Sequence, residues 1–195
     1  MTNENLAYKN PPVTELIEGK VYLMSPQPLV QHNYVVTNIG RIFATYLLGK
    51  TCRAFVDGVD VYLDEKNHYV PDAMIVCDRS KIRRRGIYGA PDLVVEVLSP
   101  STMMHDRGPK MRHYAEAGVR EYWLITPEAR TVEVYGNQDG RLELVATYAD
   151  YLEEDLEAMT EEERAAVATE IPVSLYDDFR VSVKDIFLDV DTLEK

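Results

Sequence analysis

Two carboxylates, Asp72 and Glu96, are the residues of this sequence whose setting most clearly indicates chemistry. Glu96 lies in the middle of the apolar segment PDLVVEVL, and Asp72 opens a second apolar segment, PDAMIVC. An ionised carboxylate that leaves water without a partner loses several kcal/mol of solvation free energy. Glu96 therefore needs a cation, a metal ion or a bound proton, unless it faces solvent at the end of a strand.

Strand alternation puts Asp92 and Glu96 on the same face. If the segment PDAMIVC pairs with this strand, Asp72 lies near Glu96. Two carboxylates, a backbone carbonyl that we assign to Val97, and water form the oxygen-rich environment that magnesium prefers. Such an ion activates water and neutralises charge on a phosphodiester. The pattern thus predicts a Mg²⁺ (or Mn²⁺) site at Asp72, Glu96 and Val97, and the alternative is that Asp72 merely opens its strand.

Lys110 is expected in the first turn of the helix that follows the strand, from where its ammonium can reach back over the strand's C-terminal end. There it would position the attacking water or bind the scissile phosphate. The structural alternative is an ion pair with Asp106, four residues earlier, and Asp106 itself is expected to cap the helix. His32 begins an earlier helix and is a candidate phosphate ligand or acid, or else a solvated helix terminus.

Weaker candidates have a structural explanation beside the functional one. Glu18 lies in a predicted hairpin turn, and Asp92 is either an outer metal ligand or a turn residue. The basic run from Lys81 to Arg85 would meet a DNA backbone near the metal, although a solvated loop is the default. Trp123, inside a predicted strand, is expected in the core.

The elements that would position these residues alternate between α and β. Apolar periodicity and turn residues predict a hairpin over 15–24, a helix over 31–48, strands from 52, 59 and 71, a strand over 91–98, a helix over 107–117, strands from 121, 131 and 142, and an acidic helical segment at about 150–170. The nearly continuous apolar run 91–98 is typical of a strand covered on both faces, so we expect it inside the sheet. We predict one α/β (mixed α+β) domain over residues 1–195, a mixed β-sheet flanked by helices.

Composition bounds the classes of function. No stretch reaches the about 18 uninterrupted apolar residues that span a bilayer, and the polar segment Met1–Asn10 does not resemble a secretory signal. A cytoplasmic protein without membrane contact is therefore expected. The formal net charge of -12 opposes general binding of nucleic acid unless basic residues gather on one face. Cys52 and Cys77 are too few for a structural zinc site and are expected to be buried free thiols.

A family resemblance rests on several of these strings taken together. The strings PDAMIV, APDLVVEVLSPST and AGVREYWLI, with Asp106, Lys110 and Tyr114 between them, closely resemble the putative restriction endonuclease branch of the PD-(D/E)XK nuclease superfamily. With ELIEGKVYLMSP and His32, the resemblance covers roughly residues 15–135. It implies a restriction-endonuclease-like core, a divalent metal and hydrolysis of phosphodiester bonds.

The resemblance carries the ligand role onto Asp72 and Glu96 and departs from the superfamily at one position. The lysine expected two positions after the glutamate is absent, and Leu98 stands in its place. The resemblance to this branch implies that the lysine has moved to the following helix, which gives its role to Lys110.

Three functions follow as hypotheses. The first is a Mg²⁺- or Mn²⁺-dependent endonuclease that hydrolyses DNA phosphodiester bonds, with DNA favoured over RNA and a homodimer expected because twofold symmetry is common. The second is a non-catalytic, dimeric interaction protein that keeps the nuclease fold, which the acidic composition favours. The third is a metal-dependent phosphodiesterase that acts on RNA or nucleotides.

Overall fold

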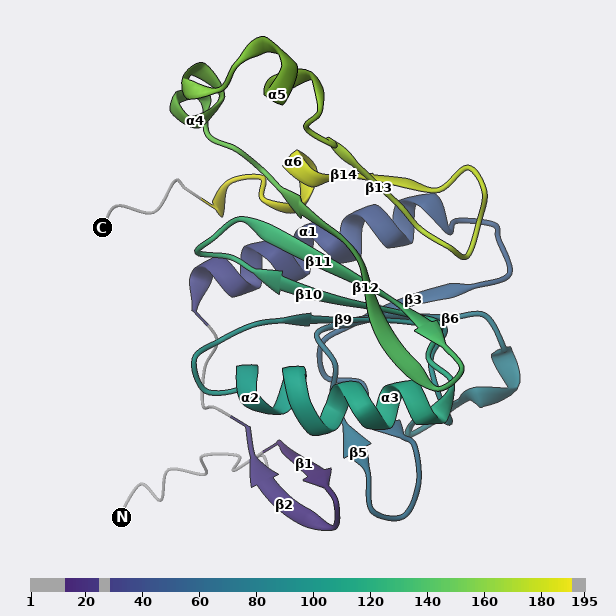
Figure 1. The fold of residues 1–195 in the computed structure, drawn as a ribbon. Coiled ribbons are helices and arrows are strands. Elements are labelled where there is room, and N and C mark those ends of the chain that lie inside the picture. The colour runs from purple at the N-terminus through teal and green to yellow at the C-terminus, as the bar shows by residue number, and fades with distance from the viewer. Residues whose placement is uncertain (1–12, 25–28, 191–195) are drawn as a thin grey trace, which may run out of the picture.

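The computed structural model describes residues 13–24 and 29–190, built around a six-stranded mixed sheet (Figure 1). Its strand order is β12-β11-β10-β9-β6-β3, in which β9 and β10 run parallel and the other neighbours run antiparallel. The strands are β3 (Arg53–Val56), β6 (Ala73–Val76), β9 (Leu93–Val97), β10 (Glu121–Thr126), β11 (Thr131–Gln138) and β12 (Arg141–Ala149). The predicted mixed sheet flanked by helices is confirmed, and β9 lies inside it.

A second six-stranded sheet, with the order β2-β1-β5-β4-β8-β7, packs below the first. Its strands are β1 (Thr14–Ile17), β2 (Lys20–Leu23), β4 (Val61–Tyr62), β5 (His68–Tyr69), β7 (Ile82–Arg83) and β8 (Gly86–Tyr88). The predicted hairpin is confirmed as β1 and β2, with its turn at Glu18 and Gly19, both at positive φ. The strand expected from Val59 is shorter than predicted and belongs to this second sheet.

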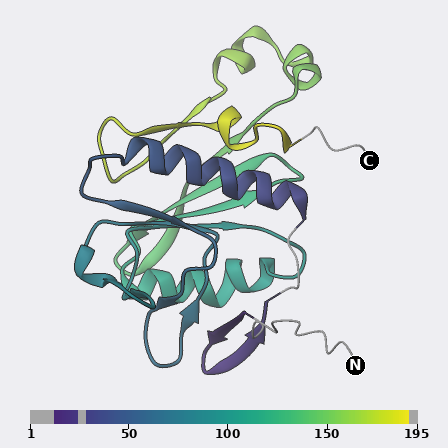
Figure 2. The same ribbon diagram turned by 180° about the vertical axis from the view of Figure 1, so that it is seen from behind.

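Helices cover both faces of the central sheet (Figures 1 and 2). On one face, α1 (Val30–Tyr46) packs with α6 (Val183–Ile186) and the hairpin of β13 (Glu170–Pro172) and β14 (Arg180–Ser182). On the other face lie α2 (Met103–His105), the π-helical turn η2 (Asp106–Lys110) and α3 (Met111–Ala117), between the two sheets. None of the helices in the described parts of the chain is long and apolar enough to cross a membrane.

The remaining helices are short. A 3₁₀ turn, η1 (Arg79–Lys81), follows β6, and the predicted acidic segment forms α4 (Glu153–Ala158) and α5 (Glu161–Ala165), which project beyond the sheet in Figure 1. The N–H of Glu163 donates a hydrogen bond to the Thr160 side chain, and the N–H of Thr160 donates one to the Glu163 carboxylate. The helix α5 therefore begins with the expected capping box.

The helix after β9 begins earlier than predicted, and the N-cap role expected for Asp106 is wrong. The carbonyl of Ser99 accepts the N–H of Met103, so the helix starts at α2 and Asp106 lies inside it. Pro109 falls in the wider π turn, where a residue without an N–H interrupts the regular ladder. Asp106 and Lys110, the first and last residues of this turn, are 1% and 2% exposed.

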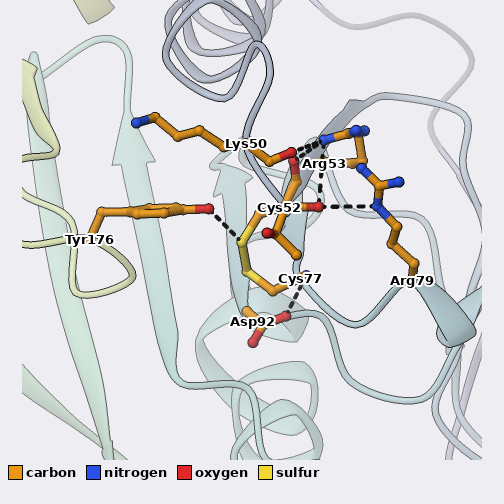
Figure 3. The surroundings of a disulfide bond; sticks show 8 residues. Lys50, Cys52, Arg53, Cys77, Arg79, Asp92 and Tyr176 are labelled. Carbon is orange, nitrogen blue, oxygen red and sulfur yellow. Dashed lines mark hydrogen bonds between the residues drawn. A yellow bond between two sulfur atoms is a disulfide. The ribbon is translucent and has the colours of Figure 1, made fainter.

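Cys52 and Cys77 form a disulfide, so the prediction of free thiols is wrong (Figure 3). The antiparallel register of β3 and β6 continues to these two residues and places them opposite one another, with Cα atoms 3.9 Å apart. The sulfur of Cys52 accepts a hydrogen bond from the Tyr176 hydroxyl, and the N–H of Cys77 donates a hydrogen bond to the Asp92 carboxylate. The pairing depends on strand register, which the sequence spacing of the two cysteines does not reveal.

The disulfide closes a 25-residue loop, which predicts a measurable contribution to stability. Chain-entropy arguments give about 3.5 kcal/mol for a loop of this size. We therefore expect the Cys52→Ala/Cys77→Ala variant to lose about that much free energy of unfolding relative to the oxidised protein in urea titrations. The matched control is the wild type in reducing agent, which should behave like the variant. Identical midpoints for oxidised and reduced wild type would contradict this prediction.

Candidate active site

A cavity of about 450 Å³ lies at the C-terminal end of β9, next to the start of α1 and beside α2 and η2. It brings together the four residues predicted to be catalytic, Asp72, Glu96, Lys110 and His32, together with Val97. Its other lining residues are Val13, Met24, Leu29, Gln31, Asp57, Gly58, Val70, Leu98, Ser99, Pro100, Ser101, Thr102, Asp106, Pro127 and Glu128. Residues from distant parts of the sequence therefore share one concave site.

Asp72 directly precedes β6 and lies beside Glu96. The antiparallel register of β6 and β9, continued by one residue, sets Asp72 opposite Glu96. One carboxylate oxygen, Oδ2, accepts the N–H of Val97 at 2.6 Å, and Oδ1 lies 3.2 Å from Nε2 of His32. The Asp72 carboxylate is thus fixed at the cavity wall by a backbone donor and a side chain.

Glu96 is 3% exposed, so the alternative of a solvent-facing glutamate does not apply. Its Oε1 lies 3.2 Å from Nζ of Lys110 and accepts a long hydrogen bond of 3.5 Å from the Tyr114 hydroxyl. The neighbours of Glu96 on the same strand face, Val94 and Leu98, lie in the core between the two sheets, as alternation predicted. The strand itself therefore delivers this carboxylate to a buried position.

Lys110 is surrounded by three carboxylates. Nζ lies 2.8 Å from Glu15, 3.2 Å from Glu96 and 3.1 Å from Asp106. The expected i, i+4 pair with Asp106 is present, but it accompanies the contact with Glu96 and does not replace it. The contact with Asp106 lacks hydrogen-bond geometry, because its Oδ1 has no hydrogen-bond partner.

Glu15 is the residue of this site that the sequence analysis missed. It lies on β1, is 7% exposed, and its Oε1 also accepts the N–H of Val70 at 3.0 Å. The available signal was strand alternation, because Glu15 shares a strand face with the buried Ile17. Glu18, chosen instead, lies at the exposed turn and pairs with Arg112.

Burial and the neighbouring charges shift the pKa values of Glu96 and Lys110. Burial raises the pKa of Glu96 well above its ordinary range, Lys110 opposes that shift, and Asp106 adds to it. Burial lowers the pKa of Lys110, but the charges of the surrounding carboxylates outweigh burial and hold its pKa well above its ordinary range. Lys110 is therefore an ammonium at neutral pH. Together with Asp72, four acidic side chains therefore share the site with the ammonium of Lys110.

His32 carries a testable pKa shift. Burial lowers its pKa, but the hydrogen bond to Asp72 and the charge of that carboxylate prevail, so the net pKa is raised above 6.5. A raised folded-state pKa contributes stability that is fully present below about pH 6.5 and is lost as pH rises through the raised value. We expect the imidazole of His32, followed by NMR, to titrate above its ordinary value, and Asp72→Asn to lower its pKa. An unchanged pKa in Asp72→Asn would contradict this assignment.

A divalent ion at this site would need oxygen donors from several groups. Across residues 13–24 and 29–190, no group of three or more His, Cys, Asp or Glu side chains is arranged to hold a metal ion. An ion here would rely on two carboxylates, a backbone carbonyl and water. Mg²⁺ keeps several waters and accepts one or two carboxylates, and it would offset the buried negative charge of Asp72 and Glu96. The residues present fit such an ion.

The weaker candidates lie outside the cavity. The carboxylate of Asp92 binds the N–H of Cys77 at the opposite end of β9 from Glu96, so its role as an outer metal ligand is wrong. None of residues 81–85 lines the cavity, so the alternative that this run meets DNA near the metal is not supported, and Arg83, Arg84 and Arg85 are exposed, as expected of a solvated loop. Trp123 is fully buried, which confirms its prediction as a core residue.

Three comparisons with known proteins bear on this site. The family model Uma2, described as "Putative restriction endonuclease", matches residues 4–173. An uncharacterized protein from Synechocystis sp. is 29% identical over 136 residues, which cover 69% of this chain and 71% of that protein. The crystal structure of a putative nuclease belonging to DUF820 from Anabaena variabilis shares the fold, with a TM-score of 0.67 and 24% identity, covering 92% of this chain and 94% of that one. Because the family model spans most of the sequence, this chain belongs to the Uma2 family of putative restriction endonucleases.

Proposed function

We propose that this protein is an endonuclease that hydrolyses DNA phosphodiester bonds with Mg²⁺ or Mn²⁺ as its cofactor. Membership of the Uma2 family supports a nuclease. The observation that carries the proposal is the cavity in which Asp72 and the buried Glu96 lie beside the ammonium of Lys110. Buried carboxylates in excess of their cations are the setting in which a divalent ion is bound.

Asp72 and Glu96, with the carbonyl of Val97, would hold the ion. When bound, it supplies positive charge that neutralises a phosphodiester and lowers the pKa of water. The hydrogen bond from the N–H of Val97 to Asp72 keeps that carboxylate at the cavity wall before any ligand arrives. Prior fixation of this kind reduces the reorganisation that binding would otherwise require.

Lys110 would supply a cation at the reacting phosphate or its water. An ammonium has three donors, and the donor nearest Asp106 makes no hydrogen bond with that carboxylate, because Oδ1 of Asp106 has no hydrogen-bond partner. That donor can turn toward a phosphate oxygen or the attacking water while Glu15 and Glu96 hold the side chain. His32, on the cavity wall, would contact a second phosphate oxygen.

Glu15 would act as a positioning residue, through Lys110. Replacing Glu15 with glutamine keeps an oxygen that accepts the N–H of Val70 but removes the charge beside the ammonium. We expect cleavage to slow by about 10-fold, as for other partners that orient a catalytic group, and the pH profile of cleavage to shift because the pKa of Lys110 falls. Glu18→Gln, at the exposed turn, is the matched control. Equal rates and profiles for both variants would contradict the role of Glu15.

The proposal is tested by cleavage of supercoiled plasmid, single-stranded DNA and structured RNA with Mg²⁺ or Mn²⁺, each repeated in EDTA. Cleavage of DNA that needs the metal is the expected result. Cleavage confined to RNA or nucleotides would replace the substrate and keep the chemistry. No cleavage of any of these would contradict the proposal and favour the non-catalytic interaction protein. The homodimer and the cytoplasmic location stay predictions.

A further inference from the structure

The two faces of the second sheet differ in character. The inner face contributes Ile17, Val61, Tyr69 and Ile87 to the core beneath the central sheet. On the opposite face, strand pairing aligns half-buried side chains from neighbouring strands. Tyr62 lies opposite His68 and also opposite Tyr88, and His68 lies opposite Leu16. Aromatic rings of consecutive strands therefore stand in a row on the outer face.

The rings of this row stack on one another. The centroids of His68 and Tyr62 are 4.5 Å apart with an interplanar angle of 6°, and those of Tyr62 and Tyr88 are 4.7 Å apart at 21°. The guanidinium of Arg83 lies 4.6 Å from the centroid of Tyr88. The stacked row, His68, Tyr62, Tyr88 and Arg83, thus ends at the edge strand β7 with a planar cation.

Three consecutive arginines, Arg83, Arg84 and Arg85, are exposed where β7 turns into β8. Within the part of the chain that the structure describes, no carboxylate forms an ion pair with any of the three, whereas Arg107 and Arg112 each pair with a glutamate. The sequence has 33 acidic residues against 21 basic ones, so a basic cluster without acidic partners runs against the overall charge. Its charge is complementary to an external polyanion.

We infer that the stacked row and its arginines bind single-stranded nucleic acid, an inference that rests on the proposed nuclease function. Arg83 would stack its second face on a base, and Arg84 and Arg85 would contact phosphates. Paired bases in a duplex have both faces covered, so only an unpaired base can extend the row. Because residues 81–85 do not line the cavity, this surface is separate from the carboxylate site.

This surface lies on the sheet that contains β1, the strand that carries Glu15. The row begins at β5, which pairs with β1, and β1 carries Glu15 beside Lys110. A nucleic-acid strand bound along the outer face would therefore run across the sheet whose first strand supplies Glu15, the partner of Lys110. The assigned role is to hold substrate at a distance from the reacting bond.

The test is fluorescence anisotropy with a labelled single-stranded DNA oligonucleotide and with the duplex of the same sequence, in EDTA so that no cleavage occurs. We expect Arg84→Ala/Arg85→Ala to weaken binding of the single strand about 10-fold or more and to lower the slope of log affinity against log salt by about 1.4. We expect Arg83→Ala to weaken binding of the single strand about 10-fold and to affect the duplex much less. The control is Arg41→Ala/Lys184→Ala, which removes two exposed cations elsewhere and should bind like the wild type.

The outcomes separate this surface from the proposed activity. Arginine variants that bind like the wild type, while the wild type cleaves DNA, would overturn the surface and leave the nuclease function standing. Arginine-dependent binding by a wild type that cleaves nothing would uphold the surface and contradict the nuclease function. Equal losses for single strand and duplex in Arg83→Ala would overturn the stacking role, because stacking distinguishes unpaired from paired bases.

Discussion

Asp72→Asn is expected to slow metal-dependent cleavage of DNA by on the order of 10³-fold, because it removes one charged ligand of the ion that stabilises the transition state. Asparagine keeps an oxygen that can accept the N–H of Val97, so the free energy of unfolding should change little. The measurement is the single-turnover rate of cleavage as a function of Mg²⁺ concentration, in parallel with urea unfolding.

Asp57→Asn is the matched control for this variant. Asp57 lines the same cavity and is not a proposed ligand, so its substitution should leave the rate within a few-fold of wild type. Cleavage by Asp72→Asn at the wild-type rate would remove Asp72 from the metal site. Equal losses in both variants would indicate a general electrostatic effect of the cavity and not metal ligation.

Lys110→Met is expected to lose most of the activity and about 3–5 kcal/mol of stability, because it leaves buried carboxylates without their cation. Glu15, Glu96 and Asp106 all lie within 3.2 Å of Nζ. The measurement is urea unfolding, with Lys184→Met as the control, because Lys184 is exposed on α6 and its loss should cost little. A stability loss in Lys110→Met no larger than in the control would contradict the role of this cluster.

The pH dependence of this loss has a definite sign. The folded-state pKa of Glu96 is raised above 4.5, and removal of the ammonium raises it further. The stability linked to its protonation is fully present below about pH 4.5 and is lost as pH rises through the raised value. Lys110→Met should therefore be destabilised less at pH 5 than at pH 8. A loss independent of pH would show that the carboxylates are not the cause.

The parts of this structure that local periodicity controls were predictable. The long apolar run around Glu96 indicated a strand buried on both faces. Its alternation put Glu96 on one face and Leu93 and Val95 on the other face, which packs against α1. The hairpin of β1 and β2 and the helix α1 followed from equally local signals. Once β6 and β9 were assumed to pair, Asp72 had to lie near Glu96.

The parts that depend on register and long-range packing were not predictable. The disulfide requires the register of β3 against β6, and the contact between Glu15 and Lys110 requires the second sheet to pack over η2. Strands of two residues, such as β4, β5 and β7, are too short for alternation to be seen. Pro109 suggests the first turn of a helix and so predicts Asp106 as the cap, whereas the π turn admits that proline within the helix.

The most direct test of the central claim is calorimetric titration of Mn²⁺ and Mg²⁺ into the wild type and into Glu96→Gln, at low salt and neutral pH. The account predicts that the wild type binds the ion and that Glu96→Gln, which keeps the shape of the side chain but not its charge, weakens binding at least about 10-fold. Wild type that binds neither ion, alone or with a phosphorothioate oligonucleotide that resists cleavage, would contradict a metal site at Asp72 and Glu96.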